Sequence, residues 1–211
     1  MKPPTPSGSL PMLIVISAPS GGGKTTLCQQ LLTRHPEMTR AITCTTRAPR
    51  AGEMDGRDYF FIDSEEFTRG VECGAFLEHA RVHDHSYGTP KTEVLEKLHQ
   101  GNDVLLNIDV QGAATVCSRA VADAELRGAL VTVFLTPATL GELEARLRRR
   151  GTDAPTELKK RLGVARQEIA QWRQFQYLII STSIAEDVRR MEAIIDAERM
   201  RQSRSKFTVE D

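Results

Sequence analysis

Four short apolar runs recur along the chain, with helical patterns between them. They lie at Met12–Ala18, Asp103–Val110, Ala129–Leu135 and Tyr177–Ser181. The runs are nearly continuous and rich in β-branched and aliphatic residues, a pattern typical of strands buried on both faces of a parallel sheet. Because alternating strands and helices form parallel sheets with right-handed crossovers, we predict an α/β fold with a central parallel β-sheet flanked by helices.

Signals for helices lie between these strands. After the first strand, Leu27 and Leu31 stand one helical turn apart and predict a helix that packs one face. Thr139–Glu142 and Ser183–Glu186 have the spacing of a capping box, and Thr89-Pro90 marks a further helix start. These local signals agree with the overall alternation of strands and helices.

Two stretches depart from the alternation. Between Ile42 and Tyr87 the predicted strands, at 59–62 and 76–82, are short and aromatic, with one short helix started by Asp63 or Ser64. This pattern predicts an inserted α+β lobe. The polar segment Arg150–Thr156 joins two helical patterns and has the composition of a hinged flap. We therefore predict a flexible leader at 1–9 and one domain at 10–211, made of three parts: a core (about 10–41, 88–145 and 170–205), a lobe (about 42–87) and a lid (about 146–169).

Composition and charge narrow the class of protein. The chain has 211 residues, of which 40% are hydrophobic and 27% charged, enough for one ample hydrophobic core. No apolar run approaches the roughly 20 residues of a membrane span, so we expect no membrane partner. The 28 basic and 28 acidic residues leave no net charge, which argues against a nucleic-acid partner. The four cysteines are widely spaced, which favours reduced thiols in a cytoplasmic protein over a disulfide framework or a zinc site.

A phosphate-binding loop follows the first predicted strand. Residues 18–25, A-P-S-G-G-G-K-T, fit the pattern G-x-x-x-x-G-K-[ST], with alanine in place of the first glycine. The glycines let backbone N–H groups turn toward anionic oxygens, Lys24 reaches the terminal phosphates, and the Thr25 hydroxyl can bind Mg²⁺. We predict ATP binding by this loop and the residue after it, through Ala18, Pro19, Ser20, Gly21, Gly22, Gly23, Lys24, Thr25 and Thr26.

A second candidate phosphate site lies in the segment Thr43–Glu53, which places Arg47 and Arg50 three apart on a proline- and glycine-marked loop. Of the 28 basic residues only seven are lysine, so 21 are arginine, the side chain suited to bidentate contacts with phosphate. Together with the residues that follow, up to Phe61, the segment closely resembles the T-T-R-x-P-R-x-G-E-x-x-G-x-D-Y-x-F signature of guanylate kinases. The resemblance continues through 76–78, 87–89, 108–112 and 146–162, and it covers roughly residues 11 to 200 in the family's order.

The resemblance implies a P-loop kinase that uses Mg²⁺ to transfer the γ-phosphoryl group of ATP to GMP, and to dGMP, giving GDP and ADP in purine nucleotide metabolism. It assigns the positions of Arg47, Arg50, Tyr59 and Tyr87 to the GMP phosphate. Glu78 would accept from N1–H and the exocyclic amine of guanine. The implied GMP-binding residues are Thr43, Arg47, Arg50, Tyr59, Glu78, Tyr87, Thr89 and Asn107. The implied catalytic residues are Lys24, Arg50, Arg146, Arg150 and Arg161, the last three being the lid arginines.

Three positions depart from the family's pattern or leave a choice open. Asn107 stands where the family generally has an aspartate that contacts guanine, so base selectivity is expected to be weaker than in relatives. Ser181-Thr182 replaces the usual Asn-Asp pair near the ATP base. Asp109 ends a predicted strand, where it either binds Mg²⁺ through water or is structural.

A kinase for another nucleoside monophosphate or for a sugar phosphate is the nearest alternative, chiefly because of Asn107. A non-catalytic guanylate-kinase-like binding domain is disfavoured because the phosphate loop and the lid arginines are present. His79, His83 and His85 with Asp84 would share a face of a regular strand, but positions on a pocket wall or in solvent are favoured over a metal site.

Overall fold

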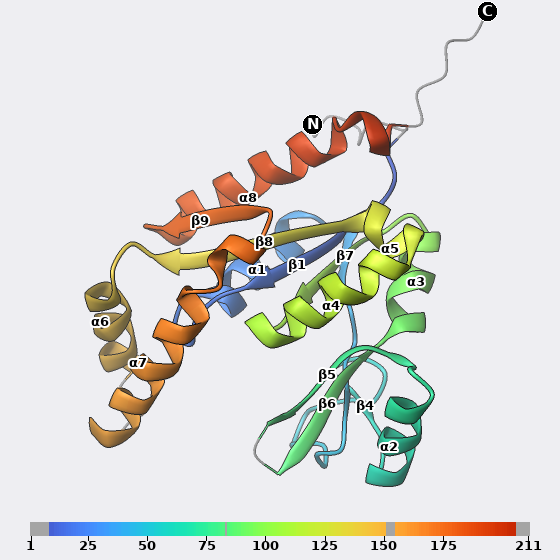
Figure 1. The fold of residues 1–211 in the computed structure, drawn as a ribbon, viewed down its shortest axis with the longest axis horizontal. Coiled ribbons are helices and arrows are strands. Elements are labelled where there is room, and N and C mark those ends of the chain that lie inside the picture. The colour runs from blue at the N-terminus through green and yellow to red at the C-terminus, as the bar shows by residue number, and fades with distance from the viewer. Residues whose placement is uncertain (1–8, 83, 151–154, 206–211) are drawn as a thin grey trace, which may run out of the picture.

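The computed structural model describes residues 9–82, 84–150 and 155–205, and within them it has a central five-stranded sheet (Figure 1). The strand order is β2-β7-β1-β8-β9, and every neighbouring pair is parallel. The predicted α/β fold is thus confirmed. The strands are β1 (Leu13–Ser17), β2 (Met38–Arg40), β7 (Asp103–Asn107), β8 (Leu130–Pro137) and β9 (Tyr177–Ser181).

Each of the four apolar runs forms a strand, but the strand predicted at Asp103–Val110 ends earlier than expected. β7 ends at Asn107, and Val110 is the first residue of α4 (Val110–Ala122). The reason is a helix cap: Oδ1 of Asp109 accepts a hydrogen bond from the N–H of Gly112 at 2.8 Å. Asp109 therefore starts a helix and does not end a strand.

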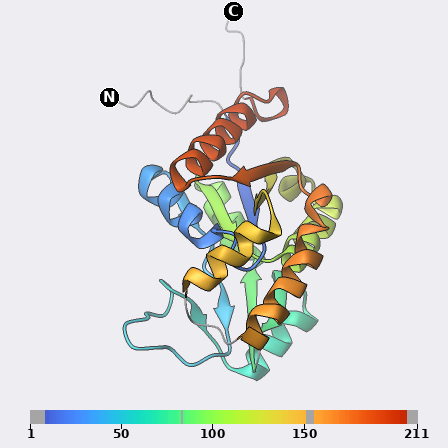
Figure 2. The same cartoon turned by 90° about the vertical axis from the view of Figure 1, so that its left-hand side faces the viewer.

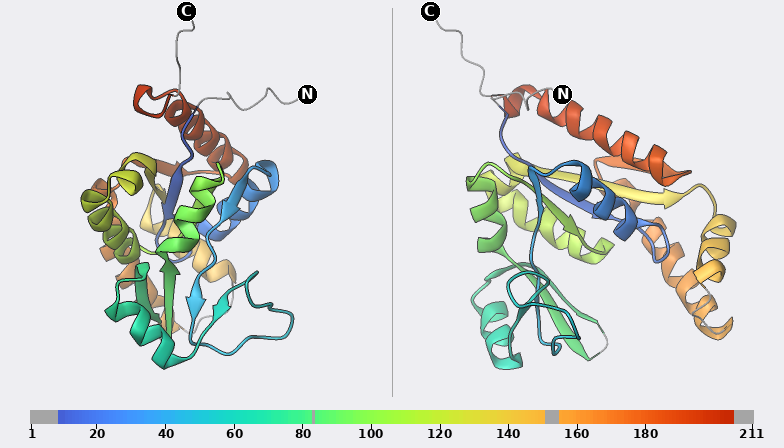
Figure 3. Two further views of the ribbon diagram at one scale, coloured as in Figure 1. Left: turned by 90° about the vertical axis from the view of Figure 1, so that its right-hand side faces the viewer. Right: turned by 180° about the vertical axis from the view of Figure 1, so that it is seen from behind.

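Helices cover both faces of the central sheet, and each face has its own buried cluster. α1 (Lys24–Arg34) and α8 (Ile184–Arg199) pack on one face, where Leu27, Leu31 and Met191 are fully buried. α3 (Lys91–His99), α4 and α5 (Ala124–Ala129) pack on the other. Figure 3 shows α1 and α4 on opposite sides of the sheet. Short 3-10 helices follow at Trp172–Gln174 and Gln202–Arg204.

All three predicted helix starts are confirmed. Thr139 and Ser183 each accept a hydrogen bond from the N–H three residues later, as a capping box requires. α3 begins at Lys91, directly after Thr89-Pro90, with Pro90 as its N-cap and Thr89 in a strand of the second sheet. The Thr89 hydroxyl is used elsewhere, as described below.

The segment between β2 and α3 folds into a second sheet of order β4-β3-β6-β5 with one helix. Its elements are β3 (Cys44–Thr45), β4 (Phe60–Phe61), α2 (Ser64–Glu72), β5 (Phe76–Val82) and β6 (His85–Pro90). Asp63 is the N-cap of α2, which settles the start that the sequence left open. β6 runs to Pro90, so the strand pairing of this sheet continues past residue 87.

A small hydrophobic cluster of Cys44, Phe67 and Phe76 holds the second sheet to its helix. The rings of Phe67 and Phe76 stack with their centroids 4.7 Å apart. Phe76 also lies against two glycines, because a Cβ built at Gly70 or Gly88 would come within 2.9 Å of its ring. The second sheet therefore depends on glycine at both positions.

Two further helices form a hairpin beside the central sheet. α6 (Leu140–Arg150) and α7 (Pro155–Ile169) pack through Leu143, Leu147 and Ala165, and Figure 2 shows them in front of the sheet. Residues 151–154, which hold most of the predicted flap, lie outside the described residues, as do residues 1–8 of the predicted leader. Within the described chain, no helix is both long and apolar enough to cross a membrane.

Candidate active site at the carboxyl edge of the central sheet

The phosphate loop follows β1 and leads into α1. Two of its glycines, Gly21 and Gly23, have positive φ angles of 86° and 98°, which glycine adopts without a steric penalty. Gly23 is the N-cap of α1 and has no side chain with which to bond the N–H groups of the first turn. These N–H groups and the positive end of the helix dipole therefore form an anion-binding site.

Gly21 also packs against α6. A Cβ built on Gly21 would lie 2.7 Å from Cδ2 of Leu147. Replacing Gly21 with alanine is expected to lower the free energy of unfolding by about 3 kcal/mol, because alanine adds both the positive-φ penalty and this overlap.

The matched control is Gly101, which has a similar φ of 84° but no neighbouring heavy atom within 4 Å of the added Cβ. Gly101→Ala should therefore lower the free energy of unfolding by only about 1 kcal/mol. Urea titration of both variants measures the two losses. Equal losses in the two variants would show that α6 does not pack on the loop in solution.

Lys24 is the first residue of α1 and connects the loop to the end of β7. Its ammonium group donates to the carbonyl oxygen of Ile108 at 2.7 Å. Burial lowers the pKa of Lys24, and the nearby carboxylate of Asp109 partly offsets that effect. Thr25 and Thr26 in the same helical turn are exposed, so a nucleotide or a metal ion can reach both hydroxyls.

A cavity of about 210 Å³ lies between the end of β7 and the second sheet. Five of the residues that the resemblance assigns to GMP line it, although they are spread over more than 60 positions of the chain. The lining residues are Thr43, Tyr59, Glu78, Ala80, Val82, Tyr87, Asn107, Ile108 and Asp109. Folding of the lobe onto the carboxyl edge of the sheet therefore assembles this site.

Glu78 is the buried acidic group of the cavity. It is 5% exposed, and its Oε1 accepts a hydrogen bond from the hydroxyl of Thr89 at 2.6 Å. Burial raises the pKa of Glu78, and the hydrogen bond from Thr89 acts in the opposite direction. A Cβ built on Gly112 would lie 3.2 Å from Oε2, so the start of α4 closes on the carboxylate. Glu78 thus has a fixed orientation at one end of the cavity.

Thr89 is another residue that the resemblance assigns to the base, and the structure shows one contact of its hydroxyl. Thr89 is fully buried and is not among the residues that line the cavity. Its hydroxyl donates to Glu78, so it positions the carboxylate. The sequence could not separate these two roles, because a threonine can donate either to a ligand or to a neighbouring carboxylate.

Arg47 lies near the two tyrosines of the cavity. Its guanidinium carbon is 5.5 Å from the ring centroid of Tyr59, and the Tyr59 and Tyr87 rings meet edge to face at 6.1 Å. Nη2 of Arg47 donates to both carboxylate oxygens of Glu53 at 2.9 Å. This bond raises the pKa of Arg47, and hydrogen bonds from Arg47 and the Arg50 N–H lower the pKa of Glu53.

Glu53 holds the two candidate arginines of this loop, and the sequence assigned it no role. It accepts from the side chain of Arg47 and from the backbone N–H of Arg50 at 2.8 Å, so it fixes the loop that carries both arginines. Its place within the T-T-R-x-P-R-x-G-E motif was the available signal. A bidentate carboxylate is the usual way to orient a guanidinium group.

Arg146 of α6 contacts the phosphate loop and the end of β9. Its Nη1 donates to Oγ of Ser181 at 3.0 Å and to the carbonyl of Gly22 at 3.5 Å. Oγ of Ser181 donates in turn to Asp187 of α8 at 2.7 Å. Asp187 is buried and was not singled out by the sequence. Ser181 therefore links Arg146 of α6 to α8.

A second cavity of about 350 Å³ opens beside Arg146. Ser181 and Thr182, which replace the family's usual Asn-Asp pair, both line it, together with Arg149. Arg148 does not line this cavity and pairs with Glu144 at 2.6 Å. Both arginines are exposed, and only Arg149 borders the cavity.

The remaining predicted residues are two arginines and the candidates for metal binding. Arg161 lies on α7, and Arg150 is the last residue of α6, where its side chain is outside the described structure. Among the described residues, no group of three His, Cys, Asp or Glu side chains could hold a metal ion. His83 lies outside the described residues. Asp109 lines the 210 Å³ cavity and caps α4 with Oδ1.

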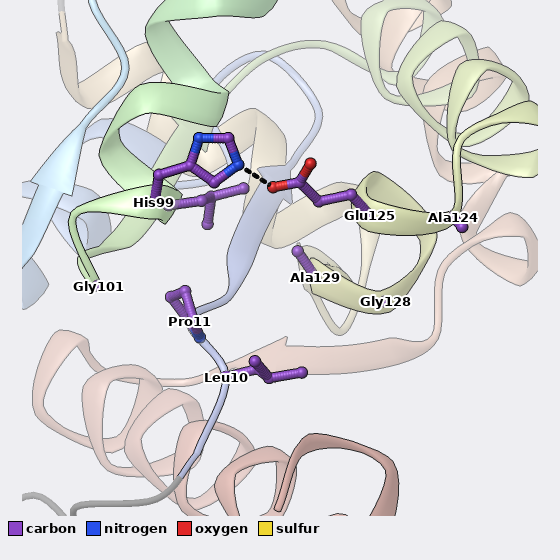
Figure 4. Close-up of a pocket in the computed structure, with 9 residues that line it drawn as sticks. Leu10, Pro11, His99, Gly101, Ala124, Glu125, Gly128 and Ala129 are labelled. Carbon is purple, nitrogen blue, oxygen red and sulfur yellow. Dashed lines mark ion pairs between the residues drawn. The ribbon is translucent and has the colours of Figure 1, made fainter. Parts of the chain in front are cut away.

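A pocket of about 340 Å³ lies away from this site, near the amino ends of the central strands (Figure 4). Leu10, Pro11 and Ala129 give it an apolar wall, and an ion pair between His99 and Glu125 spans one side. None of the predicted site residues lines it. The candidate site is therefore confined to the opposite edge of the sheet.

Comparison with known proteins places this arrangement among nucleotide kinases. The family model for guanylate kinase matches residues 11–198. A guanylate kinase of Caldanaerobacter subterraneus subsp. tengcongensis is 43% identical over 195 residues, which are 92% of this chain and 91% of that protein. One of Paramagnetospirillum magneticum is 42% identical, over 92% of this chain and 87% of its own. The crystal structure of guanylate kinase from Anaplasma phagocytophilum superposes with a TM-score of 0.70 at 31% identity, over 93% of this chain and 90% of that one.

Proposed function

Since the chain belongs to the guanylate kinase family, we propose that it transfers the γ-phosphoryl group of ATP to GMP and dGMP, giving ADP and the guanine nucleoside diphosphate. The observation that carries the choice of acceptor is Glu78, a buried carboxylate held by Thr89 at one wall of the 210 Å³ cavity. A carboxylate there pairs with two N–H donors of guanine. Adenine offers an acceptor at the matching ring position and would leave Glu78 buried with no partner besides the Thr89 hydroxyl.

The acceptor phosphate would bind where the lobe gathers its donors. Arg47, Tyr59 and Tyr87 lie together on the cavity side of the lobe, and Glu53 orients Arg47 and the Arg50 backbone. A forked guanidinium group and two phenol hydroxyls suit a dianionic monophosphate. In this proposal Asn107 and Thr43 contact the base beside Glu78, since both line the same cavity.

The donor nucleotide would bind at the phosphate loop, with Lys24 and the N–H groups of residues 20–26 around its phosphates. Thr25 and Asp109 supply oxygen ligands of the kind that Mg²⁺ prefers, and both are exposed. A bound Mg²⁺ would neutralise charge on the phosphate oxygens. Arg50, Arg146, Arg150 and Arg161 would add positive charge around the transferring group, which stabilises it by alignment and electrostatics.

The pH dependence of GMP binding tests the role of Glu78. Because burial raises its pKa, Glu78 takes up a proton at a higher pH than an ordinary glutamate, and the protonated form cannot accept from both guanine donors. The affinity for GMP, titrated without ATP, should therefore fall as the pH is lowered through this raised pKa. In Glu78→Gln only the titration of the GMP phosphate should remain, and identical profiles would exclude Glu78 from base recognition.

The reaction itself is tested by following the phosphoryl group. ATP labelled in its γ-phosphate is incubated with GMP and Mg²⁺, and the products are separated and identified. The proposal expects the label in GDP, with ADP formed in equal amount. Label in inorganic phosphate alone would mean hydrolysis, and label in another nucleotide or in a sugar phosphate, when those are supplied, would favour a different acceptor.

A further inference from the structure

One acidic side chain of α7 reaches the phosphate loop. Oε2 of Glu168 accepts a hydrogen bond from the backbone N–H of Ser20 at 3.2 Å. Ser20 is the third residue of the loop, and its N–H is one of the donors that such a loop offers to phosphate oxygens. A carboxylate of the protein therefore holds a position that an anionic ligand would take.

The charged groups that act on Glu168 belong to both nucleotide sites. Burial raises the pKa of Glu168, the Ser20 N–H and the ammonium group of Lys24 lower it, and the carboxylate of Asp109 raises it. Lys24 belongs to the phosphate loop, and Asp109 lines the cavity assigned to GMP. The charge of Glu168 therefore interacts with residues of both sites.

We propose that Glu168 occupies the loop in place of the terminal phosphate and must withdraw when a nucleoside triphosphate binds. This inference rests on the proposed function, because it takes the loop to be the donor site. Two anions cannot share the Ser20 N–H, and the like charges of carboxylate and phosphate repel each other. Glu168 is half-buried, so its side chain can rotate away without unfolding α7.

The consequence is selective for the terminal phosphate. Glu168 competes with ATP, which brings a γ-phosphate to the Lys24 side of the loop, and it competes much less with ADP. In the free enzyme its charge raises the pKa of Lys24, against the larger effect of burial. Glu168 would therefore be a positioning and specificity residue that keeps the loop charge-balanced between turnovers.

The test is the affinity of the whole protein for a non-hydrolysable ATP analogue and for ADP, measured by calorimetry without GMP. Glu168→Gln keeps an oxygen that can accept from Ser20 but removes the charge. Glu168→Ala removes both. The analogue should bind roughly fivefold tighter to each variant, the effect of losing one partly screened like charge, and ADP less than twofold tighter. Glu157→Gln, an exposed acidic position on the same helix, should change neither affinity.

Weaker or unchanged binding of the analogue by Glu168→Gln and Glu168→Ala would overturn the inference and make Glu168 a brace of the loop. Tightening by the same factor for ADP would also overturn it, because the effect would then not concern the terminal phosphate. Thermal melting of each variant establishes that it is folded before titration. Failure of the wild-type protein to bind the ATP analogue at all would instead contradict the proposed function, so the two failures are distinguishable.

Discussion

Replacing Lys24 with methionine is expected to lower kcat by roughly 10³-fold, the upper range for removal of one preorganised charged donor from an active site. The ammonium group is buried beside the loop and already bonded to the Ile108 carbonyl at 2.7 Å, so it is held in place before the nucleotide arrives. Methionine has a similar length and no charge, and it removes a buried cation, so the fold should survive. The measurement is kcat at saturating ATP and GMP.

Lys24→Arg is the control that separates charge from geometry. A guanidinium group is wider than an ammonium group and cannot replace a point donor under a glycine loop. Lys24→Arg should therefore recover less than a tenth of the lost activity. A Lys24→Met enzyme that keeps more than a tenth of the wild-type kcat would contradict the role assigned to the loop.

Replacing Glu78 with glutamine is expected to lower kcat/KM for GMP by roughly 10²-fold or more, because the amide can present a donor where guanine also presents one. The binding of ATP alone should change less than twofold, since Glu78 lies in the 210 Å³ cavity and ATP is expected at the phosphate loop. The measurement pairs GMP kinetics with a separate ATP titration. Equal losses for the two nucleotides would contradict a role in reading the base.

The same variant should be at least as stable as the wild type. Burial raises the pKa of Glu78, so ionising it opposes folding, and this cost grows as the pH rises through the raised value. Glutamine removes that charge and keeps an oxygen for the Thr89 hydroxyl, so the free energy of unfolding at neutral pH should rise by about 1 kcal/mol. A site that is costly to fold and needed for activity is typical of a binding carboxylate.

The fold was predictable because its signals are local. Apolar runs such as Tyr177–Ser181 and caps such as Ser183 report burial and helix starts within a few residues. The strand prediction that overran most, that of β7, failed at Asp109, where a side-chain cap starts a helix within an apolar run. The phosphate loop was equally predictable, because its motif consists of eight consecutive residues.

The partners of the site residues were not predictable in this way. Glu53 holds Arg47, Thr89 holds Glu78 and Asp187 holds Ser181, and each contact is a side-chain hydrogen bond. Glu168 reaches Ser20 across 148 positions of the chain. A single sequence records residue types and spacing, but these pairs exist only after the sheets and helices have packed.

The net charge of zero includes a local balance of basic and acidic groups at the candidate site. Arginines and a lysine gather at the carboxyl edge of the sheet, and acidic residues accompany them in the same place. Glu53 and Glu168 each lie within hydrogen-bonding distance of the groups that would bind phosphate. The site therefore balances its own charge before a substrate arrives.

The measurement that tests the central claim most directly is an ADP-release assay with a panel of acceptors. GMP, dGMP, AMP, UMP and CMP are compared at equal concentration with saturating ATP and Mg²⁺, and kcat/KM is determined for each. The account predicts rapid turnover with GMP and dGMP, and with AMP a kcat/KM lower by roughly 10²-fold or more. An enzyme inactive with GMP but active with another acceptor would contradict it.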